Sequence, residues 1–94
     1  MKITVVFNGI LADFIGTERA KLDLPAGAIY ADLLSEIGQS FSRNMPDKLW
    51  NREQNTFKAS VLATRDERHL TSMEMKAPLK EGDEIKFFLT LAGG

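Results

Sequence analysis

The sequence contains no cysteine among its 94 residues. This absence excludes a disulfide framework, a thiolate nucleophile and a cysteine-ligated zinc site. Basic residues number 12 and acidic residues 13, so the basic excess that is typical of nucleic-acid-binding proteins is missing. No apolar run approaches the roughly 18 residues that a membrane span needs, and no signal-peptide pattern opens the chain. We therefore expect a cytoplasmic protein that binds neither nucleic acid nor membrane.

The length corresponds to one domain with one modest core, because a chain of this size buries roughly 60–65 % of the surface that it exposes when unfolded. Apolar residues make up 44 % and charged residues 27 %, close to the globular average. An enzyme with a deep active site of its own is not expected at this size. The single histidine, His69, has only Asp66 and Glu67 beside it as other ligand types, so we predict no metal site.

Alternation of apolar and polar residues is typical of half-buried strands. It predicts four strands, at residues 1–8, 18–24, 57–64 and 84–90. The first two are expected to form an antiparallel hairpin with a short connection. The first and last are the most apolar, so we expect them to lie side by side, parallel, in the centre of a sheet.

A helical period predicts one amphipathic helix at about 28–38, with Gly38 as the left-handed residue that ends it. Residues 42–56 are expected to form a loop with one short helical turn, with Met45, Leu49 and Trp50 at the edge of the core. The pattern of residues 70–77 predicts that this segment forms a short edge strand. Strands with one polar face need cover on one side only.

These elements predict an α+β fold, a ubiquitin-like β-grasp with a mixed sheet of four to five strands packed on one main helix. We expect two parts, a β-grasp domain at 1–90 and a flexible diglycine tail at 91–94. The last eight residues carry no charged side chain. Glycines without β-carbons can enter a channel too narrow for other residues.

The carboxylate of Gly94 is itself unreactive towards nucleophiles at neutral pH. Activation by ATP as an acyl-adenylate would make its carbonyl electrophilic, after which a sulfur donor gives a thiocarboxylate and an amine gives an amide. The alternative is a frayed end with two small residues and no function.

The segment from Pro78 to Phe88, with its Leu-x-x-Gly-Asp-Glu turn, precedes a terminal Gly93-Gly94. This arrangement resembles the C-terminal signature of the MoaD/ThiS sulfur-carrier family. The first strand and the helix entry Leu24-Pro25-Ala26-Gly27 resemble that family as well. The chain departs from the family pattern at Arg65-Asp66-Glu67, which stands where many members have Asn-Gly, and it lacks their prolines before the tail.

The resemblance implies a β-grasp protein that is not an enzyme and binds no cofactor of its own. A MoeB/ThiF-like activating enzyme would use ATP to adenylate Gly94, and sulfur would then be loaded as a thiocarboxylate. Gly93, Ala92 and Leu91 would be the arm that enters the partner's channel.

The sulfur acceptor that we expect is the large subunit of molybdopterin synthase, because the double aromatic Phe87-Phe88 and the chain length resemble that branch. The alternatives are a carrier for thiazole or cysteine synthesis, a modifier conjugated to lysines, and an interaction module whose glycines are incidental.

A short tail buries too little area for specific recognition, so a docking surface is expected. Alternation places Val6, Leu62 and Phe88 on the outer face of the sheet, away from the helix, and an exposed phenylalanine among aliphatic side chains is a plausible anchor. In the family, apolar side chains on this face contact the activating enzyme. The alternative is three scattered surface residues, which are normal in soluble proteins.

Overall fold

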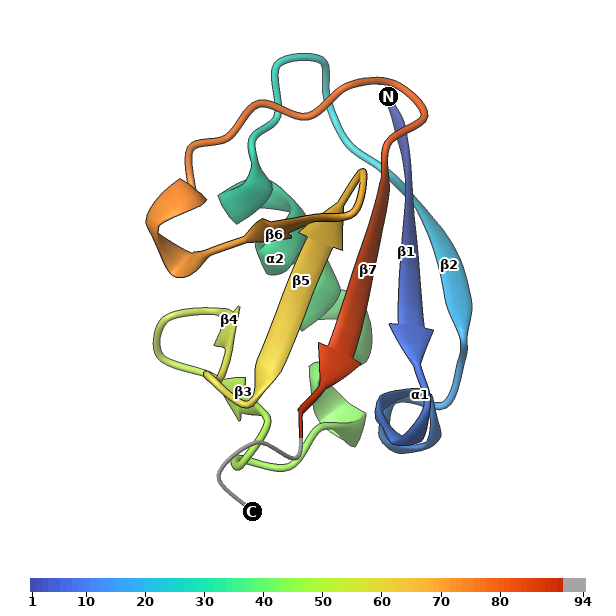
Figure 1. Ribbon diagram of the computed structural model, residues 1–94, viewed down its shortest axis with the longest axis vertical. Coiled ribbons are helices and arrows are strands. Elements are labelled where there is room, and N and C mark those ends of the chain that lie inside the picture. Colours follow the sequence, from blue (N-terminus) through green and yellow to red (C-terminus); the bar gives the residue numbers. More distant parts are fainter. Residues whose placement is uncertain (91–94) are drawn as a thin grey trace.

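Five strands form one mixed sheet in the order β2-β1-β7-β5-β6 in the computed structural model, which describes residues 1–90 (Figure 1). The strands are β1 (Lys2–Asn8), β2 (Arg19–Asp23), β5 (Val61–Arg65), β6 (Arg68–Leu70) and β7 (Glu84–Leu89). The central pair, β1 and β7, is parallel, and the other pairs are antiparallel. The predicted hairpin and the predicted parallel neighbours are therefore confirmed.

The remaining elements lie around this sheet. They are α1 (Ile10–Ile15), α2 (Tyr30–Phe41), the short 3-10 helices η1 (Ser42–Asn44) and η2 (Ser72–Glu74), and a two-stranded ribbon of β3 (Trp50–Asn51) and β4 (Thr56–Phe57). Helix α2 passes behind the sheet in Figure 1, so one face is covered and the other is open. The structure confirms the predicted α+β β-grasp. No helix formed by residues 1–90 is long and apolar enough to cross a membrane.

The core lies between α2 and the inner face of the sheet. Alternation along β1 and β7 and the helical period of α2 direct one apolar stripe of each element inward. The central members, all 0–1 % exposed, are Ile3, Val5, Phe7, Leu33, Ile37, Ile85 and Phe87. Burying one such side chain contributes about 1.5–3 kcal/mol to the free energy of folding. The face of each element that carries this apolar stripe therefore packs inward.

The connection between β1 and β2 is not the short link that the hairpin predicts. It contains α1, in which Leu11, Ala12 and Ile15 are buried. Gly9 and Gly16 flank the helix at φ 57° and 96°, values that favour glycine. A helix of six residues is too short to show its period against the neighbouring strands, which is why the sequence pattern misses it.

The expected helix at 28–38 is found as α2, but Gly38 does not end it. Gly38 is buried inside the helix, and a β-carbon there would lie 2.8 Å from Trp50 Cζ2 and 2.8 Å from Asn55 Oδ1. Its role is to admit these neighbours, and the helix continues to Phe41. Close approach and helix termination both favour glycine, and the sequence alone does not separate them.

Residues 42–60 differ most from the expectation. The predicted loop contains the β3–β4 ribbon, and Phe57 belongs to β4 rather than to the strand expected at 57–64. The Val61 N–H donates to the Lys58 carbonyl at 3.0 Å, so a turn separates β4 from β5. Trp50 packs edge-on to Phe57, with ring centroids 5.0 Å apart. Met45, Leu49 and Trp50 are buried, as predicted for core residues.

The edge strand also lies earlier than expected. It is β6, directly after the two-residue turn Asp66-Glu67, and the segment from Ser72 begins as η2 instead of a strand. Both turn residues have positive φ, 53° and 64°, which is the backbone of the tight hairpin turns that normally contain Asn-Gly. Because Asp-Glu is an unusual pair for such a turn, the sequence pattern did not indicate a tight hairpin here.

Candidate functional site

The C-terminal end of β7 is the point where the sheet stops. Phe88 pairs with Asn8 at the end of β1, and Leu89 pairs with Val61 at the start of β5. The next residue, Thr90, donates two hydrogen bonds to the Ser60 carbonyl, from its N–H at 2.7 Å and from its Oγ1 at 2.9 Å. Both described neighbours of β7, which are β1 and β5, therefore have no strand residue opposite Thr90.

The predicted tail residues Leu91, Ala92, Gly93 and Gly94 lie outside the described residues. Their roles, and the division into a domain at 1–90 and a tail at 91–94, stay predictions. The structure fixes the root of the tail at Thr90, at one end of the two central strands (Figure 1).

The three residues predicted to bind a partner lie on one face of the sheet. Leu62 on β5 is directly opposite Phe88 on β7, and Val6 on β1 is opposite Lys86, two residues before Phe88. Leu62 is 38 % exposed, Phe88 is 37 % exposed and Val6 is half-buried. We call these three residues the apolar patch. Its place next to the tail root is observed, and its role as a docking surface stays a prediction.

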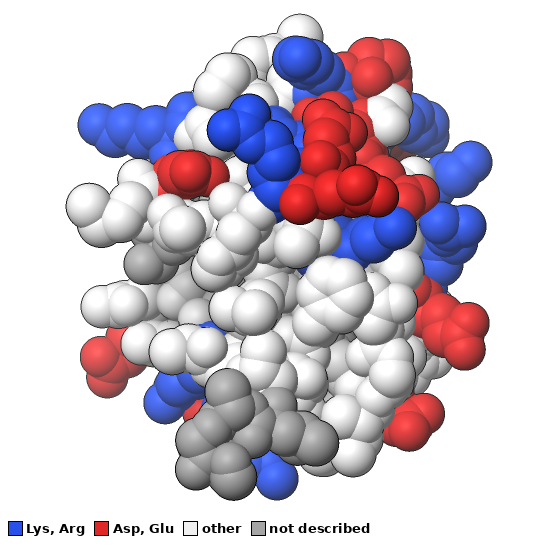
Figure 2. Space-filling view, viewed as in Figure 1, with Lys and Arg blue, Asp and Glu red and all other residues white. Residues whose placement is uncertain are grey.

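The other half of this face is charged. Glu84 on β7 forms two ion pairs. Its Oε2 lies 2.9 Å from Nη2 of Arg19 on β2, and its Oε1 lies 3.9 Å from Nζ of Lys86. Asp66 and Glu67 are exposed at the tip of the β5–β6 hairpin. Figure 2 shows charged side chains gathered over the upper half of the face and an uncharged area below them, towards the end of β7. The face is thus divided into an ionic end and an apolar end that adjoins the tail root.

The turn before β7, which carries the Leu-x-x-Gly-Asp-Glu pattern, has a structural role. Asp83 Oδ2 accepts the Lys80 N–H at 2.8 Å and lies 3.4 Å from Arg65 Nη1, and the Asp83 carbonyl accepts the Thr4 N–H at 2.9 Å. Gly82 adopts φ 85°. The pattern therefore builds the turn after which β7 enters the sheet beside β1.

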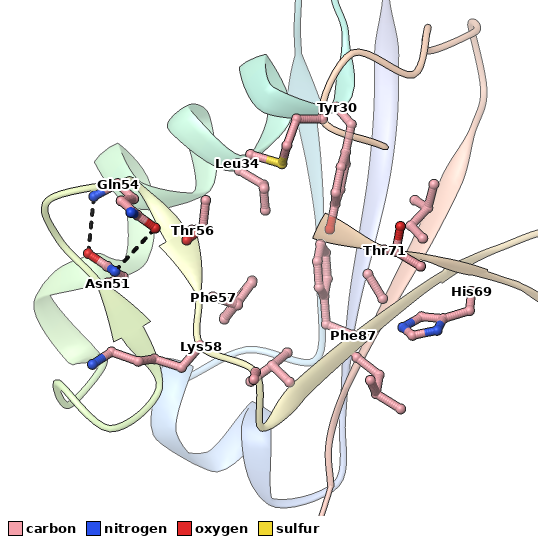
Figure 3. Close-up of a pocket in the computed structure, with 16 residues that line it drawn as sticks. Tyr30, Leu34, Asn51, Gln54, Thr56, Phe57, Lys58, His69, Thr71 and Phe87 are labelled. Atoms are coloured by element: carbon pink, nitrogen blue, oxygen red, sulfur yellow. Dashed lines mark hydrogen bonds between the residues drawn. The ribbon is translucent and has the colours of Figure 1, made fainter. Parts of the chain in front are cut away.

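A groove of about 690 Å³ lies between α2, the β3–β4 ribbon and the β5–β6 edge. In Figure 3, Leu34 from α2 and Phe57 from β4 point into it, and Tyr30 and Phe87 lie on the other side. Burial, and secondarily the negative charge of Glu74, raise the pKa of the Tyr30 phenol above its ordinary value. The groove was not predicted from the sequence, because its walls include the β3–β4 ribbon, which the alternation pattern did not indicate.

No group of three or more histidine, aspartate or glutamate side chains within residues 1–90 is placed to hold a metal ion. His69 is exposed on β6, opposite Thr64 in the register. The described part of the chain contains the apolar patch and the tail root, and the chemistry-bearing residues of the prediction are those of the tail.

The strand order, the parallel central pair and the single helix across one face define a ubiquitin-like β-grasp protein. The model of the ThiS family matches residues 5–94, almost the whole chain. The protein belongs to the ThiS family. A comparison with curated proteins finds no match.

Solved structures similar to this chain share its fold over most or all of their length. SAMP1 from Haloferax volcanii has a TM-score of 0.80 at 15 % identity, with 100 % of both chains covered. Urm1 from Trypanosoma brucei has a TM-score of 0.75 at 22 % identity, with 99 % of this chain and 95 % of that chain covered. A putative molybdopterin converting factor subunit 1 from Pyrococcus furiosus has a TM-score of 0.73 at 20 % identity, with 97 % and 99 % covered. At these identities the likeness shows the fold alone.

Proposed function

We propose that this protein is a sulfur carrier in which the carboxylate of Gly94 is adenylated and then converted to a thiocarboxylate. The observation that carries the proposal is the path of β7, which leads from the centre of a β-grasp sheet to Thr90 and so into Leu91-Ala92-Gly93-Gly94. The family match that extends to Gly94 supports it. The chain acts as substrate and carrier, and the activating enzyme supplies the ATP site and the catalysis.

The chemistry proceeds in two displacements. A Gly94 carboxylate oxygen attacks the α-phosphorus of ATP, and pyrophosphate leaves. A sulfur nucleophile, hydrosulfide in the simplest case, then attacks the carbonyl carbon, and AMP leaves with the former carboxylate oxygen. The product is a thiocarboxylate, and no electron is gained or lost in either step. Gly93 and Ala92 suit this role, because small residues let the arm enter a narrow channel.

The apolar patch of Val6, Leu62 and Phe88 is the proposed docking surface for a MoeB/ThiF-like activating enzyme. It lies beside the tail root, so an enzyme that contacts it also has the tail within reach. Phe88 is the proposed anchor, because aromatic residues at the centre of an interface often dominate its binding energy. The ionic half of the face would form a rim that aligns the partner.

For the acceptor we propose a synthase of the molybdopterin kind, with this chain as its small subunit. The Phe87-Phe88 pair and the chain length support this assignment, as does the structural likeness to the putative molybdopterin converting factor subunit. Thiazole synthesis and cysteine synthesis are the other acceptor pathways. The acceptor pathway is identified by adding each acceptor system to the loaded carrier and recording which system removes the sulfur.

A second candidate function is that of a protein modifier, in which Gly94 forms an isopeptide bond with lysines. The structural likeness to the small archaeal modifier protein SAMP1 favours it. A lysine amine would replace the sulfur nucleophile in the second displacement. Conjugates that form with ATP and the enzyme, and that disappear when Gly94 is deleted, would support this function.

The test of the proposal is intact-mass spectrometry after incubation with ATP, an activating enzyme and a sulfur donor. The chain has no cysteine and four methionines, so sulfur gained covalently has no competing thiol. We expect the mass change of one oxygen replaced by sulfur. We expect no change when Gly94 is deleted or when one residue is added after it.

An unchanged mass, with an enzyme that loads another carrier in the same assay, would contradict the proposal. It would instead favour an interaction module whose glycines are incidental.

A further inference from the structure

The two strands beside β7 leave the sheet at the same level. On one side, β1 ends at Asn8, and Gly9 turns the chain into α1 with φ 57°. On the other side, the Val61 N–H is bonded to the Lys58 carbonyl, so the chain before β5 bends away into a turn. The Ser60 carbonyl is therefore the last described acceptor beside β7 at this end.

Thr90 uses this last acceptor twice. Its N–H donates to the Ser60 carbonyl at 2.7 Å, and its Oγ1 donates to the same oxygen at 2.9 Å. A strand end held by one hydrogen bond frays readily, because the local opening free energy there is close to zero. The hydroxyl adds a second bond to the same carbonyl, so one side chain holds the end of β7.

We infer that Thr90 is the positioning residue for the reactive tail. Its paired bonds to Ser60 set the residue at which the chain leaves the sheet, and thereby set the arm at the four residues 91–94. An extended residue spans up to about 3.5 Å, so the arm reaches about 14 Å from Thr90. A partner docked at Phe88 must hold its nucleotide within that reach.

This inference rests on the proposed function, because the arm matters only if Gly94 reacts. If the bond to Ser60 opens, Thr90 joins the arm and the arm samples more conformations before it enters the partner. The loss falls on the step in which the arm is placed, after docking has occurred. Docking itself depends on the apolar patch, which Thr90 does not belong to.

The experiment compares Thr90→Val with Thr90→Ser in the thiocarboxylation assay. Valine keeps the β-branched shape and removes the hydroxyl donor, whereas serine keeps the hydroxyl. Thr4→Val is the matched control, because Thr4 lies on the same face of the neighbouring strand, opposite Glu84 and away from the tail root. The steady-state kcat and KM for the carrier are measured at saturating ATP.

We expect Thr90→Val to lower kcat roughly 2- to 10-fold, the range for losing one hydrogen bond, with KM changed less than about twofold. Thr90→Ser should restore kcat to within about twofold of the wild type, and Thr4→Val should leave both constants unchanged. Amide hydrogen exchange on the free carrier gives a second readout without any enzyme. The Thr90 amide should exchange several-fold faster in Thr90→Val than in the wild type or in Thr4→Val.

A Thr90→Val variant with wild-type kcat, or with only KM changed, would overturn the inference. So would a serine variant as impaired as the valine variant. If the wild-type chain is not loaded at all, the proposed function fails and the positioning role fails with it. If the wild type is loaded and Thr90→Val is loaded equally fast, the positioning role alone fails.

Discussion

Phe87 and Phe88 are adjacent in the chain and lie on opposite faces of β7. Phe87 is 0 % exposed, stacks on Phe7 at a centroid distance of 5.8 Å, and contacts Phe57 at 4.9 Å. Phe88 is 37 % exposed and lies opposite Leu62 on the outer face. The same residue type thus serves the core on one face, while the other face keeps apolar surface available beside the tail root.

These exposures show that the inner and outer apolar residues of β7 contribute differently to folding. An inner residue is retained because its removal costs folding free energy. An outer one that stays partly in water contributes less to folding, and single exposed apolar residues are common on protein surfaces, so the role of Phe88 in binding a partner stays a prediction. Substitutions that separate the effect on stability from the effect on a partner therefore test the division between the two faces.

The largest expected effect is that of Phe87→Ala. Removing a buried phenylalanine costs about 3–5 kcal/mol, a large part of the 5–15 kcal/mol that is typical of a domain. Urea unfolding followed by the fluorescence of Trp50, the single tryptophan and a buried one, gives the free energy of unfolding. A loss of less than about 1 kcal/mol in the free energy of unfolding would show that the inner face tolerates a large cavity. It would contradict the difference between the two faces.

Phe88→Ala should have the opposite profile. We expect less than about 1.5 kcal/mol of lost stability, and a KM for the activating enzyme about 30-fold higher, which corresponds to about 2 kcal/mol for an interface anchor. Met73→Ala is the matched control, because Met73 is 91 % exposed on η2. An unchanged KM in Phe88→Ala would remove the apolar patch from the docking surface.

Gly38→Ala tests the contact between α2 and the ribbon. The added β-carbon would lie 2.8 Å from Trp50 Cζ2, which forces a shift that costs about 1–3 kcal/mol. The helix propensity of alanine returns up to about 1 kcal/mol. We expect a net loss of about 1 kcal/mol in urea unfolding, whereas Ser40→Ala, at an exposed position of the same helix, should be neutral or slightly stabilising. A stabilised Gly38→Ala variant would show that the ribbon moves freely.

Glu67→Gly should change the free energy of unfolding by about as much as Gly38→Ala, but it should stabilise the protein. Glu67 adopts φ 64°, and glycine reaches this region without steric cost, so a gain of about 1 kcal/mol is expected. Glu53→Gly is the control, because Glu53 lies in another exposed turn and does not have positive φ. It should be neutral or slightly destabilising by thermal unfolding. A destabilised Glu67→Gly variant would mean that the Glu67 side chain contributes to the hairpin.

Much of the fold was predictable, because strong periodic signals coincide with the largest buried areas. The strands at the two ends of the sequence alternate regularly, and the structure pairs them in the centre of the sheet. The stripe of α2 containing Leu33 and Ile37 likewise identified the helix. The errors fall where a segment is too short for its period to emerge, as in α1 and the β3–β4 ribbon.

The candidate site divides in the same way. Outward alternation was enough to place Val6, Leu62 and Phe88 on one face, since parity along a strand decides the face. It did not give their spacing, which depends on the register between three strands. The double bond from Thr90 to Ser60 was also beyond the sequence pattern, because it joins residues 30 positions apart.

The alternating strands, the amphipathic helix and the uncharged end with its two glycines are local properties of the chain. They follow from neighbouring residues and can be seen in the sequence. Three features are visible only in the folded chain. Gly38 admits Trp50, Phe57 belongs to the β3–β4 ribbon, and Thr90 bonds the end of β7 to Ser60. The physical reason is that each of these features is a contact between distant segments. Its energy exists only after the chain has brought those segments together.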